Sequence, residues 1–454
     1  MLFRPILPIL FSLSFILGNS IKDRYTDASL SIISKALSDS TAYNRLAYLC
    51  DTFGPRLSGS KNLENAINWI LKEMKKDGLV HVQGERVKVP AWIRGKESIT
   101  LLKPFKKDLT MLGLGGSIAT PRAGIVAEVM VVDDFKELED RSKKAKGKIV
   151  LFNVPFTNYG KTVRYRSGGA VAASKVGAVA SIIRSVGPYS MNTPHTGNSR
   201  YEEGVRKIPH AAITVEDAAM MGRMVNRGQT VTVNLKMEGR YEDDVPSRNA
   251  IAEIRGSEYP DEVVVMGGHI DSWDVGQGAM DDGGGCVAAW QAVKLMKDLG
   301  LTPRRTVRVV LWTNEENGLR GGNAYRDAHK DALDNHILAI ESDGGVFKPS
   351  GFGFSGSDEA FNMITDIGKL LSPIESGKIT KGGGGADIGP IMREGVPGMG
   401  LRVDGSKYFW YHHTNADSWD KLDRDEFNRC VATMAVMAYV VADMDERLPR
   451  KADQ

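Results

Sequence analysis

Short apolar runs alternate with longer amphipathic segments through the carboxy-terminal half of the chain. A helix is predicted at 287–297, where Trp290, Val293 and Met296 recur at helical spacing on one face. Four apolar runs have the length and composition of buried strands, at 263–266, 307–312, 337–340 and 399–403. Strands and helices in alternation favour an α/β fold with a mostly parallel mixed sheet flanked by helices.

The pattern changes between about residues 121 and 244. Short valine-rich runs there alternate with segments rich in alanine and glycine, such as 168–176, and no close cluster of His, Asp and Glu occurs. The strands predicted in this stretch are 125–132, 148–152 and 231–235. We interpret 121–244 as a separate α/β domain inserted between two parts of one catalytic domain, 45–120 and 245–454.

The first 44 residues differ from the rest. Arg4 precedes an apolar run, 6–17, that is followed by small residues, which is typical of a secretory signal at 1–20. This run is shorter than the roughly twenty residues of a membrane-spanning helix. Residues 21–44 predict an amphipathic helix that is either a propeptide or the first helix of the domain. We therefore expect a secreted or lysosomal protein without a membrane span.

Composition and charge exclude some classes of protein. With 42% apolar and 25% charged residues the chain is not largely disordered, and 454 residues predict two domains. A net charge of +3 gives no electrostatic reason to expect nucleic acid or an anionic membrane as a partner. The three cysteines, Cys50, Cys286 and Cys430, are predicted to be buried thiols, with one disulfide at most.

The residues that could carry chemistry follow the predicted strands. The loop HIDSWDVGQGAMDDGGG, 269–285, comes after the first of them, and clusters of acids or histidines follow the other three. In open α/β sheets ligands bind at the edge where the carboxyl ends of the strands lie. The candidate metal ligands expected at this edge are His269, Asp281, Glu316, Asp343 and His413.

These residue types suit zinc. Imidazole and carboxylate ligands without a nearby thiolate are typical of a catalytic rather than a structural zinc site. Two ions about 3.5–4 Å apart need a bridging carboxylate and further ligands on each side, which one His and one acid per ion with a shared Asp would supply. Three carboxylates packed together would also repel one another unless cations offset their charge. We therefore predict two zinc ions per chain.

Two further acids are predicted to have supporting roles. Glu315 stands beside a ligand and could act as the general base that takes a proton from the attacking water. Asp271, two residues after His269, could accept the free N–H of that imidazole and fix its tautomer. Simpler interpretations exist for single residues: His412 and His413 as a surface pair, and Asp387 as a helix cap. The occurrence of every cluster behind its own strand favours the metal site.

Five longer segments carry a family resemblance: FGPRLSGSKNLENA, GGHIDSWDVGQGAMDDGGG, TNEENGLRGGNAY, ESDGG and WYHHTNAD. They resemble the co-catalytic zinc exopeptidases, which include bacterial aminopeptidases and glutamate carboxypeptidase. The resemblance spans nearly the whole chain after the predicted signal. It implies the zinc exopeptidase fold with an inserted protease-associated domain, and assembly as a homodimer.

The resemblance also implies a role for each site residue. It assigns the ligands as His269 and Asp343 for one zinc, Glu316 and His413 for the other, and Asp281 as the bridge. Glu315 is implied as the base and Asp271 as the support of His269. A cis peptide bond is implied between Asp281 and Asp282.

The function that follows is hydrolysis of dipeptides or short peptides with free termini, through a water held between the two zinc ions. One alternative is an aminopeptidase that acts on longer peptides. Another is a catalytically inactive receptor-like protein on the same fold, although such proteins lose ligands. Gly385, Ala386 and Asp387 stand where some relatives have Ser-Asp-His, so recognition of the substrate ends stays open. Tyr408 or Tyr411 could steady the oxyanion or simply pack.

Overall fold

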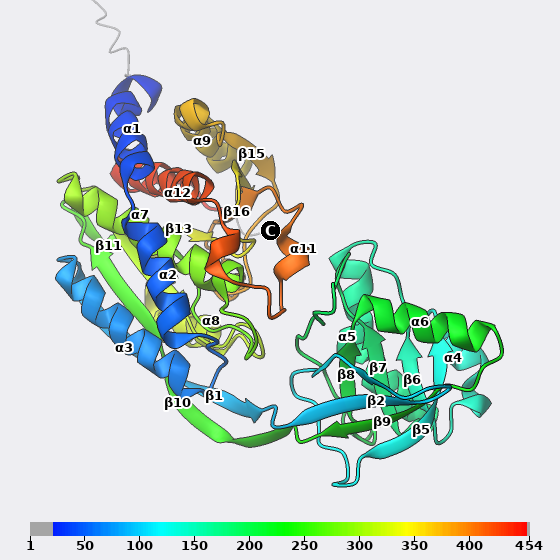
Figure 1. Ribbon diagram of the computed structural model, residues 1–454. Helices are drawn as coiled ribbons and strands as arrows, with labels where there is room; N and C mark the ends of the chain where they lie inside the picture. Colours follow the sequence, from blue (N-terminus) through cyan, green and yellow to red (C-terminus); the bar gives the residue numbers. More distant parts are fainter. Residues whose placement is uncertain (1–20, 452–454) are drawn as a thin grey trace, which may run out of the picture.

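The structure is a computed structural model that describes residues 21–451. The signal peptide predicted at residues 1–20 lies outside the described residues. Two bodies are visible in Figure 1, each built around its own eight-stranded sheet. We call residues 21–93 and 240–451 the main domain, and residues 94–239 the inserted domain.

The main domain has a mixed sheet whose central strands are parallel. In spatial order the strands are β1 (Val80–Ile93), β10 (Arg240–Ile254), β12 (Arg305–Trp312), β11 (Tyr259–His269), β13 (His336–Glu341), β16 (Gly398–Val403), β14 (Pro349–Ser355) and β15 (Lys378–Lys381). The middle four, β12, β11, β13 and β16, pair in parallel, and antiparallel pairs flank them. All four contain the runs that the apolar pattern predicted, so the α/β prediction is confirmed.

Helices cover the faces of this sheet. They are α1 (Ile21–Ser38), α2 (Thr41–Phe53), α3 (Lys61–Lys76), α7 (Gly284–Asp298), α8 (Arg320–Ala328), α9 (Asp358–Gly368), α10 (Gly389–Met392), α11 (Tyr408–Tyr411) and α12 (Arg424–Asp443). Helices α7 and α12 are buried along most of their length, which places the core between them and the sheet. At the start of α3, the Ser60 hydroxyl accepts the N–H of Leu63 and so caps the helix.

The amphipathic stretch predicted at 21–44 forms α1 and the first turn of α2. Ile32 and Ile33 are buried in the main core, and Tyr25 packs edge-on against Tyr439 of α12 at 6.3 Å. The chain turns at Asp39, whose carboxylate accepts the N–H of Thr41. In this structure the segment is therefore helical and packed into the domain.

The inserted domain has its own sheet and two cores. Its strands are, in spatial order, β3 (Lys107–Leu109), β2 (Glu97–Lys103), β9 (Thr232–Met237), β5 (Ile125–Val132), β6 (Ile149–Phe152), β7 (Ala180–Arg184), β8 (His210–Ile213) and β4 (Met111–Gly113). Its helices are α4 (Phe135–Asp140), α5 (Tyr159–Lys175) and α6 (Val215–Asn226). Apolar side chains are buried on both faces of the sheet.

The inserted domain starts earlier than residue 121. Strands β2 to β4, which the sequence analysis left in the catalytic domain, belong to the second sheet because β2 pairs with β9 and β4 with β8. Alternating apolar residues predict a strand but do not say which sheet it joins. The long strands β1 and β10 pair with each other along the route between the two bodies (Figure 1).

Shorter helical turns of the 3-10 or π type lie at Ser142–Lys144, Ala279–Gly283, Lys330–Asn335, Lys369–Ile374 and Trp419–Lys421. Within residues 21–451 no helix has the length and apolar character needed to cross a bilayer. Cys50, Cys286 and Cys430 are free and buried, as expected, and the single disulfide that the sequence allowed does not form.

Candidate metal centre

The five predicted ligands meet at the carboxyl edge of the central parallel strands. His269 is the last residue of β11, while Glu316 and Asp343 follow β12 and β13 within a few residues. His413 follows α11, the short helix after β16, and Asp281 lies in the turn that leads into α7. The strand order brings together residues that are up to 144 positions apart in sequence, His269 and His413 among them.

The carboxylate of Asp281 lies between two groups of ligands. Its Oδ1 is 3.1 Å from Nε2 of His269, and its Oδ2 is 3.1 Å from Nε2 of His413. Asp343 Oδ1 lies 3.4 Å from His269 Nε2, and Glu316 Oε2 lies 3.1 Å from His413 Nε2. We call His269 with Asp343 the His269 half, and His413 with Glu316 the His413 half.

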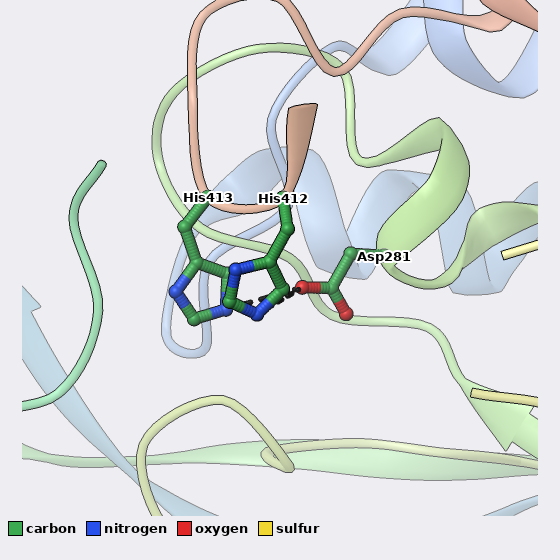
Figure 2. Close-up of side chains that lie close together, drawn as sticks. All are labelled: Asp281, His412 and His413. Atoms are coloured by element: carbon green, nitrogen blue, oxygen red, sulfur yellow. Dashed lines mark ion pairs between the residues drawn. The ribbon is translucent and has the colours of Figure 1, made fainter. Parts of the chain in front are cut away.

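His412 also faces this centre. Figure 2 shows both histidine rings beside the Asp281 carboxylate, and the two rings stack with centroids 3.5 Å apart. The Nε2 of His412 is 3.5 Å from Asp281, so a three-residue ion site could also be drawn from Asp281, His412 and His413. His413 has the shorter contact with Asp281 and also contacts Glu316. Both rings are buried, so the interpretation as a surface pair is wrong.

The chemistry of this cluster fits metal ions. Asp281 Oδ2 and Glu316 Oε1 are buried without a hydrogen-bond partner, which costs free energy unless something else satisfies them. Burial, followed by the nearby Asp281 charge, raises the pKa of Glu316 to about 7. Burial opposes ionisation of Asp281 as well, yet the neighbouring imidazoles of His269 and His413 hold its pKa well below the usual range. Cations would relieve both the repulsion and the missing bonds.

Arg56 holds the loop that carries His269 and Asp281. The side chain is fully buried, and its guanidinium donates only to backbone carbonyls, those of Gly54, Ile270, Gln277 and Gly278. The loop is thereby tied at both ends to the segment before α3. Sequence reasoning missed this residue, although the motif FGPRLSG that contains it was a signal.

Two more buried acids shape the turn at Asp281. Asp282 accepts the N–H groups of His269 (3.1 Å) and Gly285 (3.2 Å), and Asp417 accepts those of Ala279 (2.9 Å) and Met280 (2.8 Å). The peptide bond between Asp281 and Asp282 is cis, which confirms what the resemblance implied. The double aspartate in the sequence signalled Asp282, and Asp417 is the last residue of the motif WYHHTNAD.

Asp271 supports His269 through a different atom from the one predicted. The Nδ1 of His269 donates to the backbone carbonyl of Asp271 at 2.9 Å, while the Asp271 carboxylate is 3.8 Å away. That carboxylate instead accepts the N–H groups of Glu315 (3.0 Å) and Glu316 (3.3 Å) and the hydroxyl of Ser58 (3.2 Å). The Asp271 carboxylate thus satisfies backbone N–H groups that the turn after β12 leaves without a partner of its own.

Glu315 lines a pocket of about 590 Å³ that also contains Asp281, Glu316, Asp343 and His413. Burial raises the pKa of the Glu315 carboxyl well above its usual value, although the His269 charge opposes this, and the neighbouring acids add to the shift. Within residues 21–451 the Glu315 carboxylate makes no hydrogen bond or ion pair, so it can exchange a proton with a molecule in the pocket.

Tyr408 lies in the same pocket, whereas Tyr411 is not among its lining residues. Burial, with the Asp281 and Asp343 charges next in size, raises the pKa of the Tyr408 phenol well above its usual value. The phenol is therefore a hydrogen-bond donor at neutral pH.

Asp387 is not a helix cap. It is 1% exposed, neither of its carboxylate oxygens has a hydrogen-bond partner, and α10 starts two residues later. Burial raises the pKa of Asp387 well above its usual value, and the nearby Glu341 adds to this. Burial likewise raises the pKa of Glu341 to about 8, followed by the charge of Asp343. Glu341 and Asp387 thus form a second buried acidic pair close to Asp343.

The opposite wall of the pocket comes from the inserted domain. Its residues there are Tyr159, Arg166, Asn198 and Arg200. Arg166 is 7% exposed with its Nε lacking a partner, and the guanidinium of Arg200 makes no ion pair with any residue in 21–451. The pocket therefore has acids on the main-domain side and arginines on the other.

Comparisons with known proteins agree with this geometry. Residues 249–438 match the model of peptidase family M28. Carboxypeptidase Q of Xenopus laevis is 52% identical over 429 residues, which are 94% of this chain and 92% of that protein. The crystal structure of a peptidase M28 precursor from Shewanella amazonensis has a TM-score of 0.91 at 36% identity, covering 95% of this chain and 100% of that one.

A more distant structure shares the fold. BSAP, a zinc aminopeptidase from Bacillus subtilis, has a TM-score of 0.69 at 20% identity, covering 89% of this chain and 95% of that one. The resemblance to co-catalytic zinc exopeptidases is confirmed, and within them the similarity is to carboxypeptidase Q, as the long motif SWDVGQGAMDDGGG indicates. The chain therefore belongs to peptidase family M28 and is a metallo-exopeptidase.

Proposed function

We propose that the chain is a di-zinc exopeptidase that hydrolyses dipeptides or short peptides with free termini. The observation that carries this proposal is the position of Asp281, whose two carboxylate oxygens face two separate His–acid groups at 3.1 Å each. A single-ion site would not need a carboxylate shared in this way. His269 and Asp343 would hold one ion, and Glu316 and His413 the other.

The protein side chains around the ions have distinct tasks. Zinc held there would polarise the scissile carbonyl and lower the pKa of a nearby water from about 15.7 towards about 7. Glu315 takes the proton of the attacking water and passes it to the leaving amine. Its raised pKa favours this exchange because the carboxyl holds a proton more readily than an exposed one. The phenol of Tyr408 is a donor available to the developing oxyanion.

The pocket supports a short substrate with a free carboxyl end. Its volume of about 590 Å³ is within the range of sites for small molecules, roughly 300–1,000 Å³. The unpaired guanidinium of Arg200 and the amide of Asn198 can bind a carboxylate beyond the scissile bond. The name of the relatives, carboxypeptidase Q, agrees with this orientation.

Substrate tests separate this function from its alternatives. We expect about two zinc ions per purified chain, hydrolysis of a free dipeptide, and loss of activity on chelation with recovery on adding zinc. Amidation of the carboxyl end should lower kcat/KM by at least tenfold, and Arg200→Met should remove most of this preference. Equal rates on the free and the amidated dipeptide would contradict the carboxypeptidase assignment and favour an aminopeptidase.

Location and assembly are also proposals. A secreted or lysosomal setting is supported by the signal predicted at residues 1–20, and a homodimer by the resemblance alone. Mass determination in solution and analysis of the culture medium of expressing cells would test both. A monomer, or a protein retained in the cytosol, would contradict them.

A further inference from the structure

We propose that the inserted domain completes the metal centre, and that His195 and Thr196 are positioning residues for the ligand His413. This inference rests on the proposed di-zinc function, which supplies the ion that His413 would bind. It assigns to the inserted domain a role in metal affinity in addition to its place in the pocket wall.

His195 and Thr196 make three hydrogen bonds with the ligand segment. The N–H of Thr196 donates to the carbonyl of His413 at 2.9 Å, and the Nδ1 of His413 lies 3.2 Å from the carbonyl of Thr196. One residue earlier, Nδ1 of His195 donates to the carbonyl of His412 at 2.8 Å. Main chain and side chain of the ligand are therefore both held by the same two residues.

The contacts at Nδ1 of His413 leave Nε2 as the nitrogen that faces the centre, because Nδ1 lies 3.2 Å from the carbonyl of Thr196 and 3.2 Å from Nη1 of Arg166. A neutral imidazole has one N–H, and a carbonyl oxygen can only accept. If Nδ1 carries the proton and donates it to Thr196, the lone pair is on Nε2, the atom that faces Asp281 and Glu316. Arg166 holds the same carbonyl because its Nη1 donates to it at 3.3 Å. Such outer contacts orient metal-binding histidines.

The two positioning residues are fixed to the sheet of the inserted domain. The N–H of His195 donates to Ser185 Oγ at 3.0 Å, and that hydroxyl donates to Ile213 at the end of β8 at 2.8 Å. Thr196 Oγ1 donates to the carbonyl of Gly113 in β4 at 3.0 Å. Both residues are buried, so the connection from sheet to ligand is rigid and excludes water.

His413 depends on this support because of its own backbone. Its φ of +63° is in the left-handed region, which residues with a side chain adopt at a cost. Aromatic packing adds to the hydrogen bonds, since Phe409 stacks on Tyr159 of the inserted domain with centroids 5.0 Å apart. The segment that carries the ligand is thus held in place from across the domain boundary.

Metal release gives the direct test. In His195→Phe the donor to His412 is lost while the ring volume is kept, so one of the two zinc ions should be released to a chelator at least tenfold faster. His195→Asn keeps an N–H near the position of Nδ1 and should restore most of the retention. With cobalt in place of zinc, the visible spectrum of the Phe variant should change for one ion only.

A matched control separates positioning from a general loss of stability. His210 is also fully buried in the inserted domain, but its ring faces the carbonyls of Ser181 and Arg166 within that domain. His210→Phe should leave zinc release unchanged. If His195→Phe fails to fold, Arg166→Met takes its place. This variant removes the Arg166 donor to the carbonyl of Thr196, and zinc release is again expected to be faster.

The outcomes are distinct. Unchanged release in both His195→Phe and Arg166→Met, or equal acceleration in His210→Phe, would overturn the inference and leave the di-zinc function intact. A wild-type protein that binds fewer than two zinc ions would overturn both.

Discussion

The two halves of the metal centre are built in different ways. In the His269 half, the second nitrogen of the imidazole is bonded to Asp271, two residues away in the same loop, and that loop is tied down by Arg56 of the main domain. In the His413 half, the second nitrogen faces Thr196 of the inserted domain. One ligand is therefore positioned by local sequence, and the other by the docking of two domains. The affinities for the two ions that we propose for these halves need not respond alike to the same perturbation.

Removal of the shared carboxylate should have the largest effect. Asp281→Ala takes a ligand from both halves and leaves neither ion bridged, so we expect loss of both zinc ions and of all measurable activity. His269→Ala and His413→Ala, compared side by side, should each lose mainly one ion. Zinc analysis after dialysis measures this. Two retained ions in Asp281→Ala would contradict the bridging role.

A change at Glu315 should separate proton transfer from metal binding. Glu315→Gln keeps the shape and the N–H bond to Asp271 but removes the base, so kcat should fall by about 10²–10⁴-fold. Zinc content in both halves should stay at the wild-type level. The check is steady-state kinetics beside metal analysis on the same preparation. Near-normal turnover would take the role of base away from Glu315.

The smallest expected effect is on stability at acidic pH. Burial lowers the pKa of His210 from 6.5 to about 4, so the folded protein keeps this ring neutral while the unfolded chain takes up a proton near pH 6.5. The stability that the neutral ring contributes is therefore complete above pH 6.5 and decreases as the pH falls towards 4. From pH 7 to pH 5 this one group should cost on the order of 2 kcal/mol.

Thermal unfolding at pH 7 and pH 5 checks this, with His210→Asn as the variant in which the dependence should weaken. His336 is the corresponding buried histidine of the main domain, and burial lowers its pKa to about 3.

If the inserted domain loosens first on acidification, zinc should leave the His413 half before the His269 half. Simultaneous loss would show that the two halves are supported more equally than the contacts indicate.

Much of the centre could be predicted because the pattern is local. Each of the five ligands stands shortly after a strand with a clear apolar run, and parallel strands bring their carboxyl ends together whatever lies between them. The helix at 287–297 depends on neighbouring residues in the same way.

What sequence did not reveal depends on contacts between distant segments. Nothing near Thr196 in the sequence indicates that its carbonyl faces His413. In the same way, a single arginine at position 56 does not indicate that it donates to the backbone carbonyls of Gln277 and Gly278, more than 200 residues away. The Asp271 prediction named the right residue and the wrong atom, because residue types cannot show which of a carbonyl and a carboxylate lies nearer. Strands β2 to β4 were assigned to the wrong body for a related reason.

The route of the chain between the two bodies has a consequence for how such a protein can be built. It leaves the first sheet at Ile93 and returns at Arg240, and these two residues are paired neighbours in adjacent antiparallel strands. Two adjacent ends of antiparallel strands can be connected by a tight hairpin turn. The whole of 94–239 thus occupies the place of a hairpin loop, where additions are tolerated because the flanking ladder stays intact. A shortened chain closed by such a turn would keep the main sheet and lose the contacts that His195 and Thr196 make with the segment carrying His413.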